Sequence, residues 1–309
     1  MLSLLGLVLA GAATVTAVRF EANPIVTPAS SPTLGTNING PSLIRVPDWV
    51  TRPLGRYYLY FAHHQGTFIR LAYADRLTGP WRVHEPGALK LAEAPACADH
   101  IASPDVHVDA VRKEIQMYFH CPTDPKDAEN SQRTFVATSS DGLHFAPEAT
   151  ALGPYYFRVF RWGGSVHAIA RAGVFLRSRD GRSAFETGPT LFNQDPRYVL
   201  RHAAVDLRGD TLWVYYSRLG DTPERILVSQ IRLTPDWMTW RASDPEEVIR
   251  PTLEYEGANL PLKPSEFSLA PEPVRQLRDP AIFREGTRTY LLYSIAGESG
   301  IAIAELKVR

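Results

Sequence analysis

Apolar and polar residues alternate along most of the chain in short runs, which are separated by Gly, Pro, Asp and Asn. Aromatic examples of these runs are YYLYF (57–61), QMYF (116–119), LWVYY (212–216) and YLLY (290–293). Alternation with a period of two residues is typical of β-strands, and the longer period of a helix is scarce in this chain. The 25 prolines also fit a loop-rich β protein. The pattern therefore predicts an all-β fold.

One order of elements recurs along the chain: a polar start, an apolar strand, a turn, an aromatic second strand and a third apolar strand. Five copies follow this order, at 37–81, 102–145, 155–189, 198–240 and 275–306. Such repeats predict a five-bladed β-propeller, because one unit alone cannot bury both faces of its sheet. A β-sandwich is the rival architecture, but it does not predict the repeated order. The fifth copy lacks a clear outer strand, which the segment near NPIVTP (23–28) is expected to supply, closing the ring.

Composition adds little about partners, while the first residues suggest export. The 309 residues carry no net charge and no basic stripe, which argues against a nucleic-acid partner. The stretch 1–17, MLSLLGLVLAGAATVTA, resembles a secretory signal peptide cleaved after Ala17, with a membrane anchor as the alternative. The expectation is a single propeller domain over 18–309, secreted or periplasmic and free of the membrane after cleavage. No oligomerisation signal is evident.

The chain has two cysteines, Cys97 and Cys121. Cys97 precedes a predicted strand and Cys121 ends the next one, so the two positions are neighbours in an antiparallel hairpin. An exported chain with an even number of cysteines allows one disulfide. Two buried free thiols are the alternative, and the sequence leaves both open.

Candidate site residues follow from propeller geometry, in which the starts of the inner strands and the turns between second and third strands face the same end of the channel. The strand starts contribute Asn39, Asp105, His107, Arg158, Arg201, His202, Arg278 and Asp279. The turns contribute His63, His64 and Glu298. Carboxylates, imidazoles and guanidiniums match sugar hydroxyls, and Tyr155, Tyr156 and Phe157 are candidates to stack on sugar faces.

The repeat layout, with SPDV at 103–106 and RDPAIF at 278–283, resembles the five-bladed glycosidases. This group includes the arabinanase and β-xylosidase family 43, the invertase and levansucrase families, and the α-neoagarobiose hydrolases. The resemblance covers nearly the whole chain after residue 17. It implies glycoside hydrolysis by paired acidic groups, one acting as base or nucleophile and the other as acid. A carbohydrate substrate is the expected partner.

Three acidic residues are the catalytic candidates that the resemblance implies. Asp105 resembles the second-blade Asp that assists the acid, and Asp279 resembles the Asp of the invertase Arg-Asp-Pro. Glu298 would share their pocket, where desolvation or a nearby carboxylate would raise its pKa and make it the acid. Rival acids are Glu266, Glu254 and Glu256. The chain departs from family 43 at the start of the first blade, where the family has the Asp that acts as the base and this chain has Asn39.

The remaining candidates are assigned to substrate binding, and alternatives to hydrolysis stay open. The α-neoagarobiose hydrolases are thought to use a His as acid, but His63, His64, His107 and His202 are expected mainly to bind hydroxyls. Arg158, Arg201 and Arg278 are candidates to clamp an acidic sugar, unless carboxylates of the chain neutralise them. No cofactor or metal site is expected, since no metal-binding spacing occurs, although the resemblance leaves a channel calcium open.

Two other functions remain compatible with these residues. The first is a carbohydrate-binding propeller without catalysis, which the missing first-blade Asp favours, because a fold does not determine a function. The second is a phosphorylase or transferase of the same fold, in which phosphate would lie against the arginines. The sugar, its linkage and the stereochemistry of the reaction cannot be read from the residues.

Overall fold

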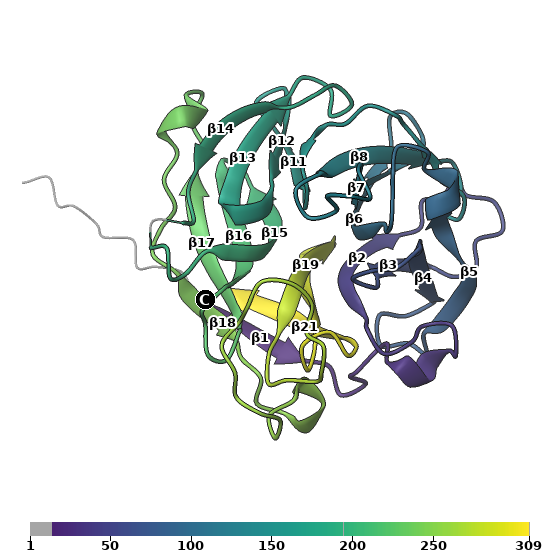
Figure 1. Ribbon diagram of the computed structural model, residues 1–309, viewed down its shortest axis with the longest axis vertical. Helices are drawn as coiled ribbons and strands as arrows, with labels where there is room; N and C mark the ends of the chain where they lie inside the picture. The colour runs from purple at the N-terminus through teal and green to yellow at the C-terminus, as the bar shows by residue number, and fades with distance from the viewer. Residues whose placement is uncertain (1–13, 194, 309) are drawn as a thin grey trace, which may run out of the picture.

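Five antiparallel sheets surround a central axis in the computed structural model, which describes residues 14–193 and 195–308 (Figure 1). Each sheet runs from an inner strand at the axis to an outer strand at the rim. The prediction of an all-β, five-bladed propeller is therefore confirmed. The described residues contain no α-helix, and their 3-10 helices are η1 (Pro28–Ser30), η2 (Leu91–Glu93), η3 (Arg171–Gly173), η4 (Trp237–Thr239) and η5 (Glu254–Glu256).

The blades follow one another along the chain, and the strands of each blade are arranged in order from the inside outward. Blade 1 contains β2 (Asn39–Arg45), β3 (Tyr57–Ala62), β4 (Phe68–Ala74) and β5 (Arg82–Lys90). Blade 2 contains β6 (Ala102–Asp109), β7 (Glu114–Pro122), β8 (Gln132–Ser139) and β10 (Gly153–Pro154), with β9 (Ala146–Pro147) also paired to β8. Blade 3 contains β11 (Arg158–Trp162), β12 (Ser165–Ile169), β13 (Val174–Ser178) and β14 (Glu186–Thr190). Blade 4 contains β15 (Leu200–Arg208), β16 (Thr211–Arg218), β17 (Ile226–Arg232) and β18 (Glu246–Ile249). Blade 5 contains β19 (Arg278–Glu285), β20 (Arg288–Ser294), β21 (Ile301–Val308) and β1 (Val15–Arg19).

The hydrophobic core lies between the blades, in clusters that each join two neighbouring sheets. Strand β3 shows how the sequence produces this arrangement. Its Tyr58 and Tyr60 pack towards blade 2, whereas Leu59 and Phe61 pack towards blade 5. Successive side chains of a strand point to opposite faces, so an apolar strand can serve two interfaces at once. This explains why the second strands are apolar at nearly every position.

The ring is closed by a strand that precedes the predicted one. β1 pairs with β21 from Val15↔Val308 to Arg19↔Ala304, whereas NPIVTP contributes only an isolated bridge between Val26 and Ile301. The N-terminal segment therefore closes the ring as expected, but the strand is β1, which lies just before NPIVTP. Residues 1–13 of the expected signal peptide lie outside the described residues, and the expected cleavage point after Ala17 lies within β1. Within residues 14–193 and 195–308, no helix is long and apolar enough to cross a membrane.

The two cysteines are joined in a disulfide between Cys97 and Cys121, with their Cα atoms 5.5 Å apart. Cys121 lies in β7, and Cys97 lies in the segment that leads into β6. Of the two alternatives that the sequence left open, the structure has the bond. It attaches the segment before β6 to the second strand of the same blade.

Candidate active site

A cavity of about 590 Å³ lies where the inner strands begin and the turns between second and third strands meet. Tyr155 and Tyr156, the stacking candidates, line it, and so do six of the predicted polar residues: Asn39, His64, Arg201, His202, Asp279 and Glu298. The six polar residues come from blades 1, 4 and 5. The propeller thus brings together the strand starts and turns as expected, although not every candidate reaches the cavity.

The inner strands of blades 1, 2 and 5 begin with the same backbone feature. Gly40, Ser103 and Asp279 each have a positive φ, between 45° and 60°, and each is followed by a proline. In all three blades the strand pairing shifts register across this residue. Asp and Gly tolerate the left-handed conformation better than most residues do. The blade-1 position that matches Asp279 is therefore Gly40, which has no side chain to offer.

Asp279 is a buried carboxylate, 3% exposed, at the wall of this cavity. Its Oδ1 accepts a hydrogen bond from the Tyr156 hydroxyl at 2.8 Å, and its Oδ2 accepts one from Ser294 at 3.1 Å. His202 Nδ1 lies 3.1 Å from Oδ1 but is not aligned for a hydrogen bond. Burial, reinforced by the negative charge of Glu298, raises the pKa of Asp279. The raised pKa favours the protonated carboxylic acid.

Glu298 is equally buried but has the opposite electrostatic environment. Its Oε1 accepts from Arg278 at 2.7 Å, and its Oε2 accepts from Asn37 at 2.6 Å and from Asn39 at 3.2 Å. Burial acts to raise the pKa of Glu298, but His64, Arg278 and Asn37 outweigh it and hold the pKa well below its usual value. The expected upward shift of the Glu298 pKa was therefore wrong, because the donors around it stabilise the ionised form.

Arg201 at the cavity wall and Arg278 behind it are neutralised by acidic residues. Arg278 lies 2.9 Å from Glu224 and 2.7 Å from Glu298, and Arg201 lies 3.7 Å from each of the same two carboxylates. Glu224 is fully buried, and Ser265 donates a hydrogen bond to it. Two guanidiniums and two carboxylates leave no net charge. This matches the alternative in which the arginines pair with the chain's own carboxylates and do not clamp an acidic sugar.

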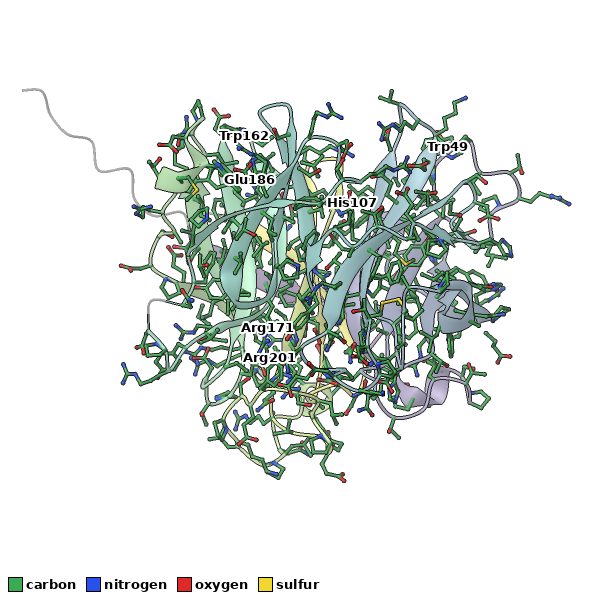
Figure 2. The ribbon with its side chains drawn as sticks, turned by 45° about the horizontal axis from the view of Figure 1, so that its top comes forward. Trp49, His107, Trp162, Arg171, Glu186 and Arg201 are labelled. Carbon is green, nitrogen blue, oxygen red and sulfur yellow. A yellow bond between two sulfur atoms is a disulfide. The ribbon has the colours of Figure 1, made fainter. Side chains whose placement is uncertain are left out.

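Asp105, His107 and Arg158 do not line the cavity. His107 Nε2 lies 2.8 Å from Asp105 Oδ2, which also accepts from the Val159 N–H. Figure 2 shows His107 far along the molecule from Arg171 and Arg201, which lie near the cavity. Asp105 comes after the register shift in β6, so the cavity-facing residues of this strand are Ala102 and Ser103. Arg158 is buried and donates to the carbonyls of Phe157 and Ala203.

The remaining predicted candidates lie in other environments. Arg278 stands behind Glu298, and His63 accepts a hydrogen bond from Gln65 within its own turn. Neither lines the cavity. Of the rival acids, Glu256 is fully buried and paired with Arg19. Glu254 and Glu266 are not cavity residues either, although Phe267, next to Glu266, is one.

The sequence reasoning missed a group of residues on the cavity wall. His120 is buried, its Nδ1 has no hydrogen-bond partner, and its ring lies 5.4 Å from that of Tyr155 and 6.0 Å from that of Tyr156. Burial first, and then the nearby cationic groups, hold its pKa well below the usual value, so the imidazole is neutral. His120 is the cavity-end residue of a second strand, a position that the search of strand starts and turns left out. Asp99, His100 and Glu129 also line the cavity and lie in connecting segments.

An aromatic and cationic rim lies at the mouth of the cavity. The Arg171 guanidinium lies 5.2 Å from the ring centre of Tyr155 and 4.5 Å from that of Phe267. Phe267 belongs to a loop that Arg201 anchors through hydrogen bonds to the carbonyls of Glu266 and Ser268. Phe267 is 47% exposed, and an exposed aromatic ring next to a polar cavity suits the apolar face of a sugar ring. Phe157, by contrast, is buried in the core between blades 2 and 3.

The resemblance left a channel calcium open, which would need a group of oxygen ligands. Within the described residues, no group of three or more His, Cys, Asp or Glu side chains could hold a metal ion. Asp279 and Glu298 are hydrogen-bonded to hydroxyls, amides and Arg278, whereas His120 Nδ1 and His202 Nδ1 have no hydrogen-bond partner.

Comparison with known proteins gives one relative with clear sequence similarity. The chain is 40% identical over 323 residues to the uncharacterized protein R118 of Acanthamoeba polyphaga mimivirus, and the match covers 94% of this chain and 90% of that protein. No family model matches the sequence.

Solved structures of glycoside hydrolases have the same fold. A GH43 β-xylosidase/α-arabinofuranosidase from a compost microbial metagenome, in complex with xylotriose, has a TM-score of 0.62 and 15% identity, over 94% of this chain and 96% of that chain. A putative glycoside hydrolase from Parabacteroides distasonis has a TM-score of 0.64 and 11% identity, over the same shares of the two chains. A GH43_1 enzyme from Xanthomonas citri has a TM-score of 0.58 and 13% identity, over 89% and 88%. At these identities the similarity establishes the fold, a glycosidase-like propeller, and nothing finer.

Proposed function

The chain belongs to one family with the uncharacterized protein R118 of Acanthamoeba polyphaga mimivirus, and from the site in its glycosidase-like propeller we propose that it is a glycoside hydrolase. The substrate is the end of an oligosaccharide or polysaccharide. A cavity of about 590 Å³ has room for a few sugar units, and its walls carry the polar groups that hydroxyls require. The aromatic rim would hold the next unit outside.

The observation that carries this proposal is the opposite pKa shift of two carboxylates on blade 5. Asp279 has a raised pKa, whereas the pKa of Glu298 is lowered, and both line the same cavity. When a site shifts the pKa values of two neighbouring acidic groups in opposite directions, it can keep one group as a proton donor and the other as an anion. Cleavage of a glycosidic bond needs this combination, because a proton goes to the leaving oxygen while positive charge develops on the sugar ring.

The contacts support a specific role for each of these groups. Asp279 acts as the acid, and the hydroxyls of Tyr156 and Ser294 hold its carboxyl in a fixed orientation. Glu298 remains an anion and aligns Asn39 and Asn37, whose amides donate to it. This assignment of roles differs from the one expected from the sequence, in which Glu298 was the acid.

The experiment is release of reducing sugar from a broad panel of polysaccharides and oligosaccharides, with and without added phosphate. The variants are Asp279→Asn, Glu298→Gln and, as a matched control, Glu186→Gln, which removes an exposed carboxylate of β14. We expect Asp279→Asn to lower kcat by at least about 100-fold, as the loss of a general acid does. Full activity in Asp279→Asn, or no release from any substrate by the unmodified chain, contradicts the proposal.

A carbohydrate-binding propeller without catalysis is the second candidate, and a specific observation favours it. The starts of the first two inner strands offer Asn39, Gly40, Ala102 and Ser103, none of which is a carboxylate. Binding of a glycan without any turnover would select this function. A phosphorylase is less well supported, because Arg201 and Arg278 are neutralised by Glu224 and Glu298. A strict need for added phosphate would revive it.

We also propose that the chain matures in an oxidising compartment, as a secreted or periplasmic protein does. The Cys97–Cys121 disulfide supports this, because such bonds persist mainly outside the reducing cytosol. Mass spectrometry of the native protein would show the linked peptide pair. A free-thiol form from its native source would contradict the proposal.

A further inference from the structure

The segment before β6 brings an imidazole and a carboxylate together at the cavity wall. His100 Nδ1 lies 2.8 Å from Asp99 Oδ2, and both residues line the cavity. The His100 side chain is 10% exposed and that of Asp99 is 53% exposed. Within the described residues, His100 Nε2 has no hydrogen-bond partner in the protein. An imidazole held by a carboxylate through one nitrogen presents the other nitrogen to a ligand.

Covalent and backbone contacts fix this segment in position. The disulfide ties Cys97 to β7, and the Ala98 N–H donates to the Pro122 carbonyl at 2.8 Å. The Ile101 N–H donates to the Gly66 carbonyl of the neighbouring blade at 2.9 Å. A catalytic group works best when its support is rigid, because small displacements weaken proton transfer. The pair is therefore placed as a preorganised unit and not as a mobile loop.

The proposed hydrolysis lacks one group, which this pair can supply. Asp279 is occupied as the acid, and Glu298 is tied to two asparagine amides and Arg278. In blade 1, the position that corresponds to Asp279 is Gly40, which has no side chain. A hydrolase still needs a base that takes the proton of the attacking water. Of the cavity histidines, His64 and His202 lie beside Glu298 and Asp279, whereas His100 is hydrogen-bonded to Asp99, a carboxylate that the proposed hydrolysis does not otherwise use.

We propose that Asp99 and His100 form the general-base pair of the reaction, with His100 Nε2 accepting the proton of water and Asp99 orienting the ring. This inference rests on the proposed glycoside hydrolysis. Water oxygen bonds to the anomeric carbon as the bond to the leaving oxygen breaks. The leaving oxygen takes the proton of Asp279, and His100 takes the proton of the water. Solvent then returns both groups to their starting states, so atoms and charge balance.

Other titratable groups share the cavity with His100 and enter its pH dependence. They are Asp99 on its own segment, His120 on β7, His64 on the turn after β3, Glu129 between β7 and β8, Tyr155 and Tyr156 before β11, His202 on β15, Asp279 on β19 and Glu298 on the turn after β20. Of these described residues, Asp99 is the one that is hydrogen-bonded to His100. The pH–rate profile of the unmodified chain contains contributions from all of them, and substitution of His100 separates the part that belongs to it.

The chain offers a matched control on its surface. His144 Nδ1 lies 2.9 Å from Asp141 Oδ2, the same kind of pair, but the His144 side chain is 83% exposed and neither residue lines the cavity. The test compares His100→Gln and Asp99→Asn with His144→Gln and Asp141→Asn, on the substrate found by the sugar-release panel. Thermal unfolding of each variant checks that it is folded.

We expect His100→Gln to lower kcat by about 100-fold or more with KM changed by less than about threefold, as removal of a general base does. The acidic limb of its pH–rate profile should flatten. Asp99→Asn should lower kcat by about tenfold, because the ring loses its orienting partner but keeps its basic nitrogen. His100→Ala should regain activity with added imidazole. The surface variants should match the unmodified chain in kcat, in KM and in the pH–rate profile.

The outcomes separate this inference from the function on which it rests. If the unmodified chain releases no sugar, the proposed function fails and this inference fails with it. If it releases sugar and His100→Gln keeps kcat and the acidic limb, only the general-base assignment fails. A rise in KM with unchanged kcat would make His100 a binding residue, which also overturns the proposal. If His100→Gln does not fold, Asp99→Asn and its pH profile decide.

Discussion

His167 lies in an aromatic cage between blades 3 and 4, where protonation should weaken the fold. Its ring stacks on Phe160 at 5.2 Å, and three tryptophan rings surround it at 5.4 to 6.4 Å: Trp162, Trp237 and Trp240. The residue is 3% exposed, and its Nδ1 has no hydrogen-bond partner. A charged imidazolium in this cage would have no anion to balance it.

The size of the effect follows from the pKa of His167 in the folded and unfolded states. Burial first, and then the positive charge of Arg177, lower the folded pKa from 6.5 to about 4. The unfolded chain therefore binds a proton more readily, and the stability that neutral His167 gives is lost as the pH falls from 6.5 towards 4. Linkage between pH 7 and pH 5 gives a loss of about 2 kcal/mol in the free energy of unfolding.

The assay is urea unfolding at pH 7 and pH 5 for the unmodified chain and for His167→Phe, with His144→Phe as an exposed control. Phenylalanine keeps the stacking but cannot take a proton. His120 and His202 are also buried, and their pKa values are also lowered, so their contribution is present in every variant and cancels in the comparison. We expect the drop in stability from pH 7 to pH 5 to be about 2 kcal/mol smaller in His167→Phe.

The control variant should show the same drop as the unmodified chain, because His144 is exposed. If His167→Phe loses as much stability between the two pH values as the unmodified chain does, the reasoning from the cage is refuted. A lower stability of His167→Phe at both pH values would not matter, since the prediction concerns only the pH-dependent part.

Three further predictions concern stability and need no substrate. Replacing Cys97 and Cys121 together by Ala should lower the free energy of unfolding by about 3 kcal/mol, because the bond closes a loop across a sequence separation of 24; a loss below about 1 kcal/mol in urea unfolding contradicts this. Glu224→Gln removes a charge that is buried between two guanidiniums and should cost about 3 kcal/mol, whereas exposed Glu186→Gln should cost almost nothing in the same assay. A chain that begins at Val18 loses the first three residues of β1, including buried Val15, and should be less stable by about 2 kcal/mol than one that begins at residue 14; equal melting temperatures would show that β1 does not seal blade 5.

The fold could be predicted because its main signal is local. Strands such as β3 and β16 are apolar on both faces, and each is preceded and followed by turn residues. A two-faced apolar strand must be covered on both sides, and five such units in series indicate a ring of blades. The outer strand of blade 5 was misplaced because β1 is short and lies at the start of the chain, far in sequence from its partner β21.

The candidate site could be predicted only in part. Asp279 and Glu298 were found because a strand start and a turn are visible in the sequence, and both line the cavity. Asp105 was placed at the cavity because it also follows a strand start. Asp105 follows Pro104, whereas Asp279 precedes Pro280, so Asp105 lies further along its strand and Ser103 occupies the cavity position of blade 2. His120 and His100 were missed because they lie outside the positions that the repeat marks.

The sequence by itself determined the all-β character, the five units and their order, and two of the acidic residues at the cavity. Alternation of side chains is a property of neighbouring residues, so it can be read along the chain. Only the tertiary structure decided that Glu224 neutralises Arg201 and Arg278, that Asp279 and not Glu298 has the raised pKa, and that the disulfide-tied segment brings His100 to the cavity. These features depend on distances between residues that are far apart in sequence, because charges interact through space and burial is set by the whole fold.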